Sequence, residues 1–351
     1  MKILYGLNGI GSGHISRARL LVPKLEAAGA EVTCLLSGRP AEKCPDLSEL
    51  GDVQLKQGLA IDFTDGKMNF LKTSLGIAMQ TPRLIMDIKD LDTSPYDLVI
   101  SDFEPITAWA AKLNGTPSIG IAHHHSFALD VPQIGAYSPF TLFMNNIVPV
   151  DTALPTHYHH FDEPILPPYK TVMNAGETDP KKILVYMNFE NTTDVIDLVK
   201  SFKDHDFYIY SHEVTSPSDQ ENLHFRPLSK EGFKQDFQTC AGIITGAGYM
   251  TSTEALQLGK KLLVKPTEGQ REQESNALTL EQLGYASTMD SLDQGVLGEW
   301  LQQSTAHKIT CPDTAQAIVD WVMDGDWKDS APLIESLWDQ VEYDTVELAA
   351  A

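Results

Sequence analysis

Short apolar runs alternate with amphipathic stretches along the chain, and the spacing of the apolar positions predicts strands and helices in turn. Helical patterns begin near Ile15, after Met68 and at Pro105. Strands that each lead into a helix are typical of parallel sheets with helices on both faces. The first half therefore predicts a doubly wound α/β unit, although Pro23 is expected to kink or shorten the first helix. The predicted strands of this half are Lys2–Leu7, Glu31–Leu36, Val53–Gly58, Leu98–Ser101 and Pro117–Ala122.

A proline-rich stretch interrupts this rhythm near the middle of the chain. Between Phe161 and Lys181, four prolines argue against both a helix and a central strand. The rhythm restarts at Ile183–Met187, and a last amphipathic helix is predicted over Trp327–Val346. The expected fold class is α/β, with two Rossmann-like doubly wound domains facing across a cleft. A length of 351 residues suits two such cores. We expect domains at 1–165 and 181–325, a linker at 166–180, and a C-terminal helix and tail at 326–351 that dock near the interdomain region.

The charge balance narrows the choice of partners. With 48 acidic and 26 basic side chains the net charge is -22, so nucleic acid and anionic membranes are repelled on average, and no basic patch stands out along the sequence. No run approaches the roughly 20 apolar residues of a membrane-spanning helix, and the chain opens on a strand pattern rather than a signal peptide. The four cysteines are scattered without a Cys-x-x-Cys pair, which favours packing roles over disulfides or zinc. We expect a cytoplasmic protein.

A glycine-rich loop follows the first predicted strand. This loop contains Gly11 and Gly13 and opens the first helix, at the sheet edge where α/β proteins bind ligands. As a dinucleotide fingerprint it is incomplete, because His14 takes the place of the third glycine. The dipole at a helix N-terminus disfavours a protonated histidine, and a neutral imidazole can accept a proton at pH 7. The loop therefore makes His14 a candidate base, although a tight turn that merely needs glycine is the alternative.

The second half carries a sharper signal. The predicted strand Gly242–Thr245 runs into a glycine turn that is followed by hydroxyl residues and by Glu254. Free N–H groups and the dipole at the start of a helix can bind a diphosphate without a metal. Glu254 lies about one turn into that helix and can accept hydrogen bonds from a ribose diol. An ordinary helix-start signature in a strand–helix crossover is the alternative explanation.

Polar residues gather again one crossover later. The segment Pro266–Ala277 follows the predicted strand Lys261–Val264 and places several amides and carboxylates at the start of a helix. Adjacent parallel strands end at the same edge of a sheet, so this segment and the glycine turn should meet in one crevice. Such groups suit sugar hydroxyls, whereas a solvated polar face is the simpler alternative.

From Gly246 to Ala277 the chain has a glycine turn, Thr or Ser, Glu-Ala-Leu, Gly-Lys, a strand, Pro, Gln and Asn-Ala in order. This stretch resembles the GT-B glycosyltransferases, especially the peptidoglycan N-acetylglucosaminyltransferase and the UDP-glycosyltransferases, and a weaker likeness covers nearly the whole chain. The resemblance implies an acceptor domain at 1–165 and a nucleotide-sugar domain at 181–325. It also implies a nucleoside-diphosphate sugar donor, with UDP as the expected nucleotide, no metal or other cofactor, and inversion at the anomeric carbon.

The resemblance also implies roles for single residues. His14 is the candidate base and Asp102, in the segment Ser101–Phe103, its orienting partner. Gln270 or Gln273, which flank Glu272, would meet the sugar, although the loop Asn188–Asn191 lacks the glycine–serine turn of relatives. The remaining donor-side candidates are Gly11, Gly13, Gly246, Ala247, Gly248 and Thr251 near the diphosphate, Glu254 at the ribose, Arg226 and Leu228 at the nucleobase, and Glu272.

Histidines gather at His123–His125 and again at His157, His159 and His160. A metal site there is one alternative. However, adjacent histidines on an extended segment point to opposite faces, and the i, i+4 spacing of helical metal motifs is missing. We therefore expect no metal, and hydrogen bonding on the acceptor side or simple exposure instead.

The leading hypothesis is metal-independent transfer of a sugar to an acceptor hydroxyl, with the acceptor a glycan, a lipid-linked molecule or a small molecule. One alternative is a nucleotide-sugar epimerase of the same architecture, since a fold does not fix chemistry. A second is a non-catalytic protein that binds nucleotide sugar or glycan. A third is an NADP enzyme in which Ser37 and Arg39 hold the 2′-phosphate. The apolar segment Phe70–Ile85, with Lys72 and Arg83, fits either a hydrophobic acceptor or the packing of a long helix.

Overall fold

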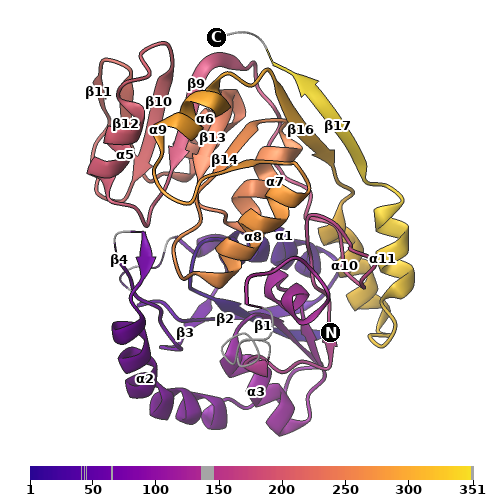
Figure 1. Cartoon of the computed structure of the whole chain (residues 1–351). Coiled ribbons are helices and arrows are strands. Elements are labelled where there is room, and N and C mark those ends of the chain that lie inside the picture. The colour runs from indigo at the N-terminus through magenta and orange to yellow at the C-terminus, as the bar shows by residue number, and fades with distance from the viewer. Residues whose placement is uncertain (41, 43, 45, 65, 136–145, 349–351) are drawn as a thin grey trace.

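Two α/β lobes are stacked on one another in the computed structural model, which describes the whole chain except residues 41, 43, 45, 65, 136–145 and 349–351 (Figure 1). The first lobe is built on a six-stranded parallel sheet in the order β3-β2-β1-β6-β7-β8. Its central strands are almost wholly apolar and are buried on both faces, as parallel strands under helices must be. The strands are β1 (Lys2–Asn8), β2 (Glu31–Ser37), β3 (Val53–Leu55), β6 (Leu98–Asp102), β7 (Ser118–Gly120) and β8 (Thr152–Ala153).

Among the described residues of the first half of the chain, three α-helices accompany this sheet. The last of them begins where the buried Glu104 caps the amides of Ile106 and Thr107, and it ends at Gly115 in the left-handed conformation. The elements are α1 (Gly13–Ala27), α2 (Phe70–Asp90) and α3 (Pro105–Asn114), the 3₁₀ turns η2 (Ser48–Leu50) and η3 (His123–Ala128), and the short hairpin β4 (Phe63–Thr64) and β5 (Lys67–Met68).

The second lobe repeats the plan with seven strands in the order β11-β12-β10-β9-β13-β14-β15, of which only β11 runs antiparallel to its neighbour among the described pairings. The strands are β9 (Asp179–Tyr186), β10 (Asp206–Ser211), β11 (Ser218–Gln220), β12 (Leu223–Pro227), β13 (Cys240–Thr245), β14 (Lys261–Val264) and β15 (Ser287–Thr288). The helices are α5 (Thr192–Val199), α6 (Lys230–Thr239), α7 (Tyr249–Gln257), α8 (Arg271–Gln282) and α9 (Gln294–Leu301). The predicted α/β fold of two Rossmann-like units is therefore confirmed.

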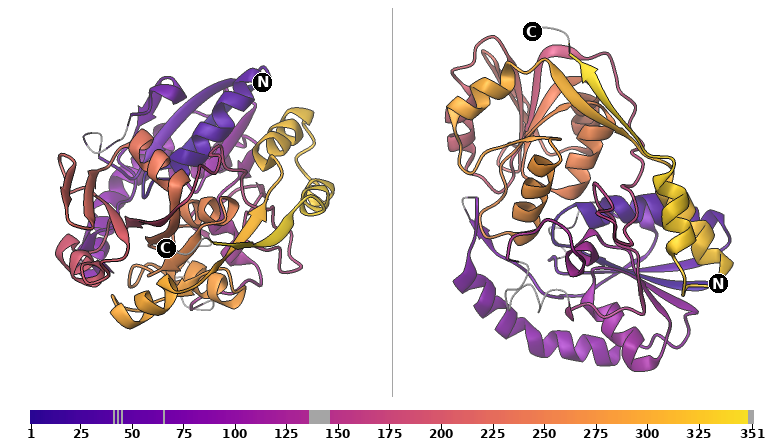
Figure 2. Two further views of the ribbon diagram at one scale, coloured as in Figure 1. Left: turned by 90° about the horizontal axis from the view of Figure 1, so that it is seen from above. Right: turned by 45° about the vertical axis from the view of Figure 1, so that its right-hand side comes forward.

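The C-terminal region crosses back to the first lobe. After β16 (Thr305–Thr310), helices α10 (Thr314–Asp324) and α11 (Ala331–Trp338) pack on the first core, and β17 (Glu342–Glu347) then returns to pair with β16 (Figure 2). Ile318 and Val322 of α10 join the cluster around α1 and β1, although they lie inside the segment 181–325 expected for the second domain. The expected limits stay predictions, but the chain already crosses between the lobes before residue 314.

Two local predictions are wrong. The helix predicted over Trp327–Val346 covers only Ala331–Trp338, because the residues after it pair with β16 as a strand. Helix α1 continues through Pro23 to Ala27, since the proline ring lies on the exposed side of the helix. Only the carbonyl of Arg19 loses its intrahelical donor at that point.

Several contacts close the two lobes onto each other. The amide of Met68 donates to the carbonyl of Glu268 over 2.9 Å, and the amide of Glu268 donates to the carbonyl of Gly66 over 2.8 Å. Thr279 in α8 donates through its hydroxyl to the carbonyl of Pro132 over 3.2 Å. Among the described residues, no helix has the length and apolar content needed to cross a bilayer.

The docking of α10 on the first lobe gives a stability prediction. Ile318 is 1% exposed in the first core, so Ile318→Ala should lower the free energy of unfolding by about 2–5 kcal/mol through lost burial and a cavity. Urea unfolding measures this. The exposed Asp320→Ala on the same helix should change it by less than about 0.5 kcal/mol. Equal, small effects of both changes would contradict the assignment of α10 to the first core.

Candidate active site

The candidate base and its partner meet at the carboxyl edge of the first sheet. His14 is the second residue of α1, which follows β1, and Asp102 ends β6, the neighbour of β1. His14 Nδ1 lies 2.7 Å from Asp102 Oδ1, and both side chains are buried. An N–H on Nδ1 that donates to this carboxylate leaves the lone pair on Nε2. Within the described part of the chain Nε2 has no hydrogen-bond partner, so it is the nitrogen free to take a proton.

Arg17, one helical turn beyond His14, completes the arrangement. Its Nε donates to Asp102 Oδ2 over 2.7 Å and its Nη2 to Oδ1 over 2.6 Å. Burial alone would raise the pKa of Asp102, but the charge of Arg17 and the hydrogen bonds from His14 and Arg17 outweigh it and hold that pKa well below its usual range. Burial also lowers the pKa of His14, and the attraction of Asp102 offsets only part of this effect. His14 is therefore neutral at pH 7 and able to act as a base.

A second imidazole connects this group to the other lobe. The His124 ring lies 5.6 Å from that of His14 and stacks on Phe103 at 4.2 Å. His124 Nε2 lies 3.1 Å from Oε2 of Glu272, in the first turn of α8. Phe103 has a φ of 52°, which non-glycine residues seldom adopt, and this backbone conformation places its ring against His124. The predicted base and a predicted donor-side carboxylate thus lie on either side of one stacked imidazole.

The glycine turn at the start of α7 leaves room for a ligand. Gly248 caps the helix without a side-chain hydrogen bond, so the first-turn N–H groups lack an intrahelical acceptor. Its φ of -69° is open to any residue, and a Cβ placed on it would meet nothing within 4 Å. A Cβ on Gly11 in the first lobe would likewise meet open space. Gly13, in contrast, packs against Met250, where a Cβ would lie 3.3 Å from that side chain.

The rest of the glycine turn is held by Asn276 of α8, and Asn276 is in turn bound by a histidine of the first lobe. The carbonyl of the buried Ala247 accepts a hydrogen bond from Asn276 Nδ2 over 2.9 Å. Oδ1 of the same amide lies 2.7 Å from Nε2 of His123, whose ring stacks face to face on Tyr249 at 4.0 Å. Burial lowers the pKa of His123 to about 4, so the ring is neutral at pH 7. The start of α7 is therefore held in place by a residue of η3.

Other predicted donor residues lie around this turn. Glu254 is partly exposed in α7, and burial raises its pKa to about 7. Gln270 caps α8, accepting from the Gln273 amide over 2.6 Å and donating to Glu272 over 3.2 Å. Gln273 Oε1 accepts from the amide of Thr267 over 2.9 Å, and its side chain also packs against Gly246. Both amides already make local bonds. Thr251, in the first turn of α7, is partly exposed.

The residues matched to the nucleobase of the donor lie further along the second sheet. Arg226 is on β12, separated from β13 by two strands, and its Nη1 donates to Asp219 over 2.8 Å and to its neighbour's carbonyl. Its guanidinium is thus held at β11 rather than at the glycine turn. Leu228 follows β12 and is 47% exposed. The loop after β9 carries Glu190, whose largely buried carboxylate pairs with Lys265 at 2.6 Å.

The NADP alternative loses its supposed phosphate site. Ser37 is buried and donates its hydroxyl to Glu104 over 2.5 Å, so it is not available to a 2′-phosphate. Arg39 instead donates to the carbonyl of Gly11 over 3.1 Å and braces the glycine loop.

The two histidine groups do not come together as ligands. His157 is buried and His125 partly buried, each has one buried ring nitrogen without a hydrogen-bond partner, and burial lowers the pKa of both. His159 and His160 lie beside Trp338 of α11. Among the described residues, no three His, Cys, Asp or Glu side chains are placed to hold a metal.

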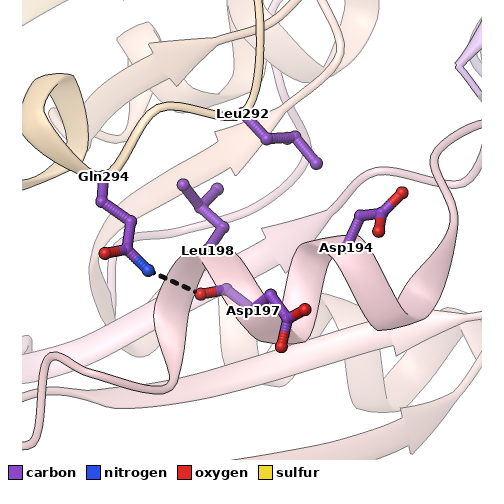
Figure 3. A pocket seen from close by; sticks show the side chains of 5 residues that line it. All are labelled: Asp194, Asp197, Leu198, Leu292 and Gln294. Atoms are coloured by element: carbon purple, nitrogen blue, oxygen red, sulfur yellow. Dashed lines mark hydrogen bonds between the residues drawn. The ribbon is translucent and has the colours of Figure 1, made fainter.

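A surface hollow between α5 and α9 is unrelated to this site. It is lined by Asp194, Asp197, Leu198, Leu292 and Gln294, and Gln294 donates to the carbonyl of Asp197 over 2.7 Å (Figure 3). Asp197 pairs with Lys200 at 2.5 Å, and none of the predicted site residues lines the hollow.

Sequence reasoning missed Arg17 and left the role of His124 undefined. Arg17 was detectable in principle, because residues at i and i+3 share a helix face and a base at position 14 implies a neighbour at 17. The contact between His124 and Glu272 was not detectable, since 148 residues and a lobe boundary separate them.

Comparisons with known proteins identify the fold and the family. Curated proteins give no match. Solved structures give full-length likenesses in fold: the spinosyn rhamnosyltransferase complexed with thymidine diphosphate (13% identity, 96% of this chain and 97% of that chain, TM-score 0.58), and Arabidopsis thaliana UGT89C1 complexed with UDP (14%, 96% and 98%, 0.56). MurG of Acinetobacter baumannii is also similar (14%, 95% and 99%, 0.51). The family model described as "Glycosyl transferase family 1" matches residues 1–304. The chain therefore belongs to glycosyl transferase family 1 and has the GT-B fold of these enzymes.

Proposed function

We propose that this glycosyltransferase moves a hexosyl group from a nucleoside-diphosphate sugar, with UDP as the expected nucleotide, to an acceptor hydroxyl without a metal. The observation that carries the proposal is the pairing of a neutral, Asp102-bound His14 with an uncapped helix start at Gly248. The two similar structures that hold UDP and thymidine diphosphate support the donor class.

Each group has a definite task in this reaction. His14 Nε2 takes the proton of the acceptor hydroxyl as it attacks the anomeric carbon, and Asp102 stabilises the imidazolium that forms. The first-turn amides of α7 hold the pyrophosphate, whose negative charge grows as the bond to the sugar breaks. Attack from the side opposite the leaving group inverts the anomeric centre.

Because the chain is strongly acidic, binding of the diphosphate depends on these backbone amides. At a net charge of -22 the overall field repels a diphosphate, so binding depends on local dipoles. We further propose a cytoplasmic site of action. In its support, Cys34, Cys44, Cys240 and Cys311 are all free thiols, as a reducing compartment favours.

Loss of the base should slow the reaction. His14→Ala should reduce turnover by roughly 10² to 10⁴-fold, the usual contribution of a positioned base, with little change in donor affinity. The measurement is UDP release from a panel of UDP-sugars, with and without hydroxyl acceptors. His160→Ala, remote from the base beside α11, is the matched control. Undiminished turnover of a folded His14→Ala protein would reject the assignment, and isomerised donor without transfer would favour an epimerase.

A negative charge introduced at Gly248 should abolish donor binding without destabilising the fold. Aspartate is a favoured N-cap, so Gly248→Asp should leave the stability of α7 unchanged or raised by up to about 1 kcal/mol. Its carboxylate should abolish protection by UDP in a thermal-shift assay, since it takes up the amides and repels a diphosphate. Ser330→Asp, the same charge at the N-cap of α11, is the control and should retain that protection. Protection of the native chain by NADPH and not by UDP would contradict the proposal.

The ionised carboxylate of Glu254 should lower the free energy of unfolding and contribute to donor binding. A pKa raised from 4.5 to about 7 means that the folded chain binds more protons than the unfolded chain between these values, so the contribution of this residue falls as the pH rises through them. Glu254→Gln should therefore raise the free energy of unfolding by about 1–3 kcal/mol at pH 8 and by almost nothing at pH 4, as measured by urea unfolding. The affinity of the Glu254→Gln variant for UDP should fall. A variant destabilised at pH 8 would show that the carboxylate is not strained by burial.

A further inference from the structure

Helix α2 faces water with its apolar side. The two buried side chains of α2, Thr73 and Asp87, are polar, whereas its apolar side chains are partly buried or exposed. Thr73 accepts from the amide of Asp62 over 3.1 Å, and the partly buried Gln80 accepts from the amide of Ala60 over 2.9 Å. Asp87 is 1% exposed and pairs with Lys56 at 3.3 Å. A helix that packs on a protein core normally shows the opposite arrangement.

The outward face carries a continuous apolar stripe. It consists of Leu71, Leu75, Met79 and Met86, which are 80%, 61%, 73% and 53% exposed. Steps of four and seven residues keep these side chains on one face of an α-helix over four turns. Single exposed apolar residues are normal on a protein surface, but a stripe of this length indicates that something apolar covers it.

The apolar surface continues beside the stripe. Where α2 meets α3, a groove of about 280 Å³ is lined by Leu84, Ile88, Trp109 and Leu113. Leu113 is itself 63% exposed. Helix α2 lies along the outer rim of the first lobe, away from the body of the second lobe, as Figure 1 and the right view of Figure 2 show. The stripe can therefore lie against a flat surface.

The charges around the stripe reverse the sign of the chain. Lys72, Arg83 and Lys89 are exposed on α2, and Asp90 is the one exposed acid of this helix. Arg83 pairs with the buried Asp87 at 3.1 Å, and Lys72 lies 4.0 Å from Asp62, so among the described residues Lys89 is the cation of the helix without an acidic partner. In a chain of net charge -22, helix α2 thus carries a small local excess of cations, three against two acids, around this exposed apolar row. A second copy of the chain is a poor occupant, since two such faces would bring like charges together and oppose two acidic bodies.

We propose that α2 docks this protein on an anionic bilayer, with Leu71, Leu75, Met79 and Met86 at the boundary of headgroups and acyl chains and with Lys72 and Lys89 at the headgroups. Helices that lie in an interface have this combination of an apolar face and Lys or Arg flanks. Each cation near an anionic leaflet strengthens binding by roughly fivefold. The proposal is independent of the catalytic residues, because none of these side chains touches them.

Vesicle flotation of the full chain tests the proposal. The native protein should partition at least about tenfold more strongly to vesicles of equal parts phosphatidylglycerol and phosphatidylcholine than to phosphatidylcholine alone. The variant Leu75→Gln, Met79→Gln, Met86→Gln should lose at least about tenfold of this binding, since three apolar side chains no longer gain from burial. Lys72→Glu with Lys89→Glu should remove the preference for the anionic vesicles.

Matched controls and the size of the particle decide the outcome. Val172→Gln, at an apolar residue in the linker that is 69% exposed, should bind like the native chain, and thermal melts should show all variants folded. Equal flotation of the native chain and the triple variant would overturn the proposal. It would also be overturned if the native chain ignored both kinds of vesicle, or sedimented as a dimer that the triple variant turns into a monomer.

Discussion

The buried carboxylate of Asp102 is the group on which the arrangement of the first lobe's active edge depends. It lies at the end of a fully buried strand, and an isolated anion there would be too costly to keep. His14 and Arg17, on one face of α1, both donate hydrogen bonds to this carboxylate and so stabilise its charge. The arginine carries the balancing charge, so the imidazole can stay neutral. A histidine paired with Asp102 alone would tend toward the protonated form, which cannot act as a base.

The second lobe completes the site through contacts rather than through a shared core. His123 stacks on Tyr249 and reaches Asn276, while Glu272 reaches His124. The same segment after β7 therefore fixes the position of the α7 start and of the α8 start relative to His14. Changes of the angle between the lobes would break these contacts together, which couples the starts of α7 and α8 to the position of His14.

Charge acts on two scales in this molecule. The overall charge of -22 opposes anions, yet the two regions expected to meet them differ locally: the start of α7 offers backbone N–H groups, and α2 offers three exposed cations. Close to such groups, their field exceeds that of distant acids, which salt screens beyond about 8–10 Å. Net charge therefore describes the average encounter and not the binding site.

The sequence by itself determined the two α/β units and the order of glycine turns after β1 and β13, because apolar periodicity and glycine spacing are local properties. It also singled out His14 and Asp102, through a resemblance carried by short motifs. The tertiary structure decided what depends on distant partners: Arg17 on the same carboxylate, Arg226 held at β11, and the return of α10 to the first core. It also decided that α2 turns its polar residues inward. The α2 pattern shows an amphipathic helix but not which face meets the protein, and the residues after Trp338 form a strand only because β16 lies beside them.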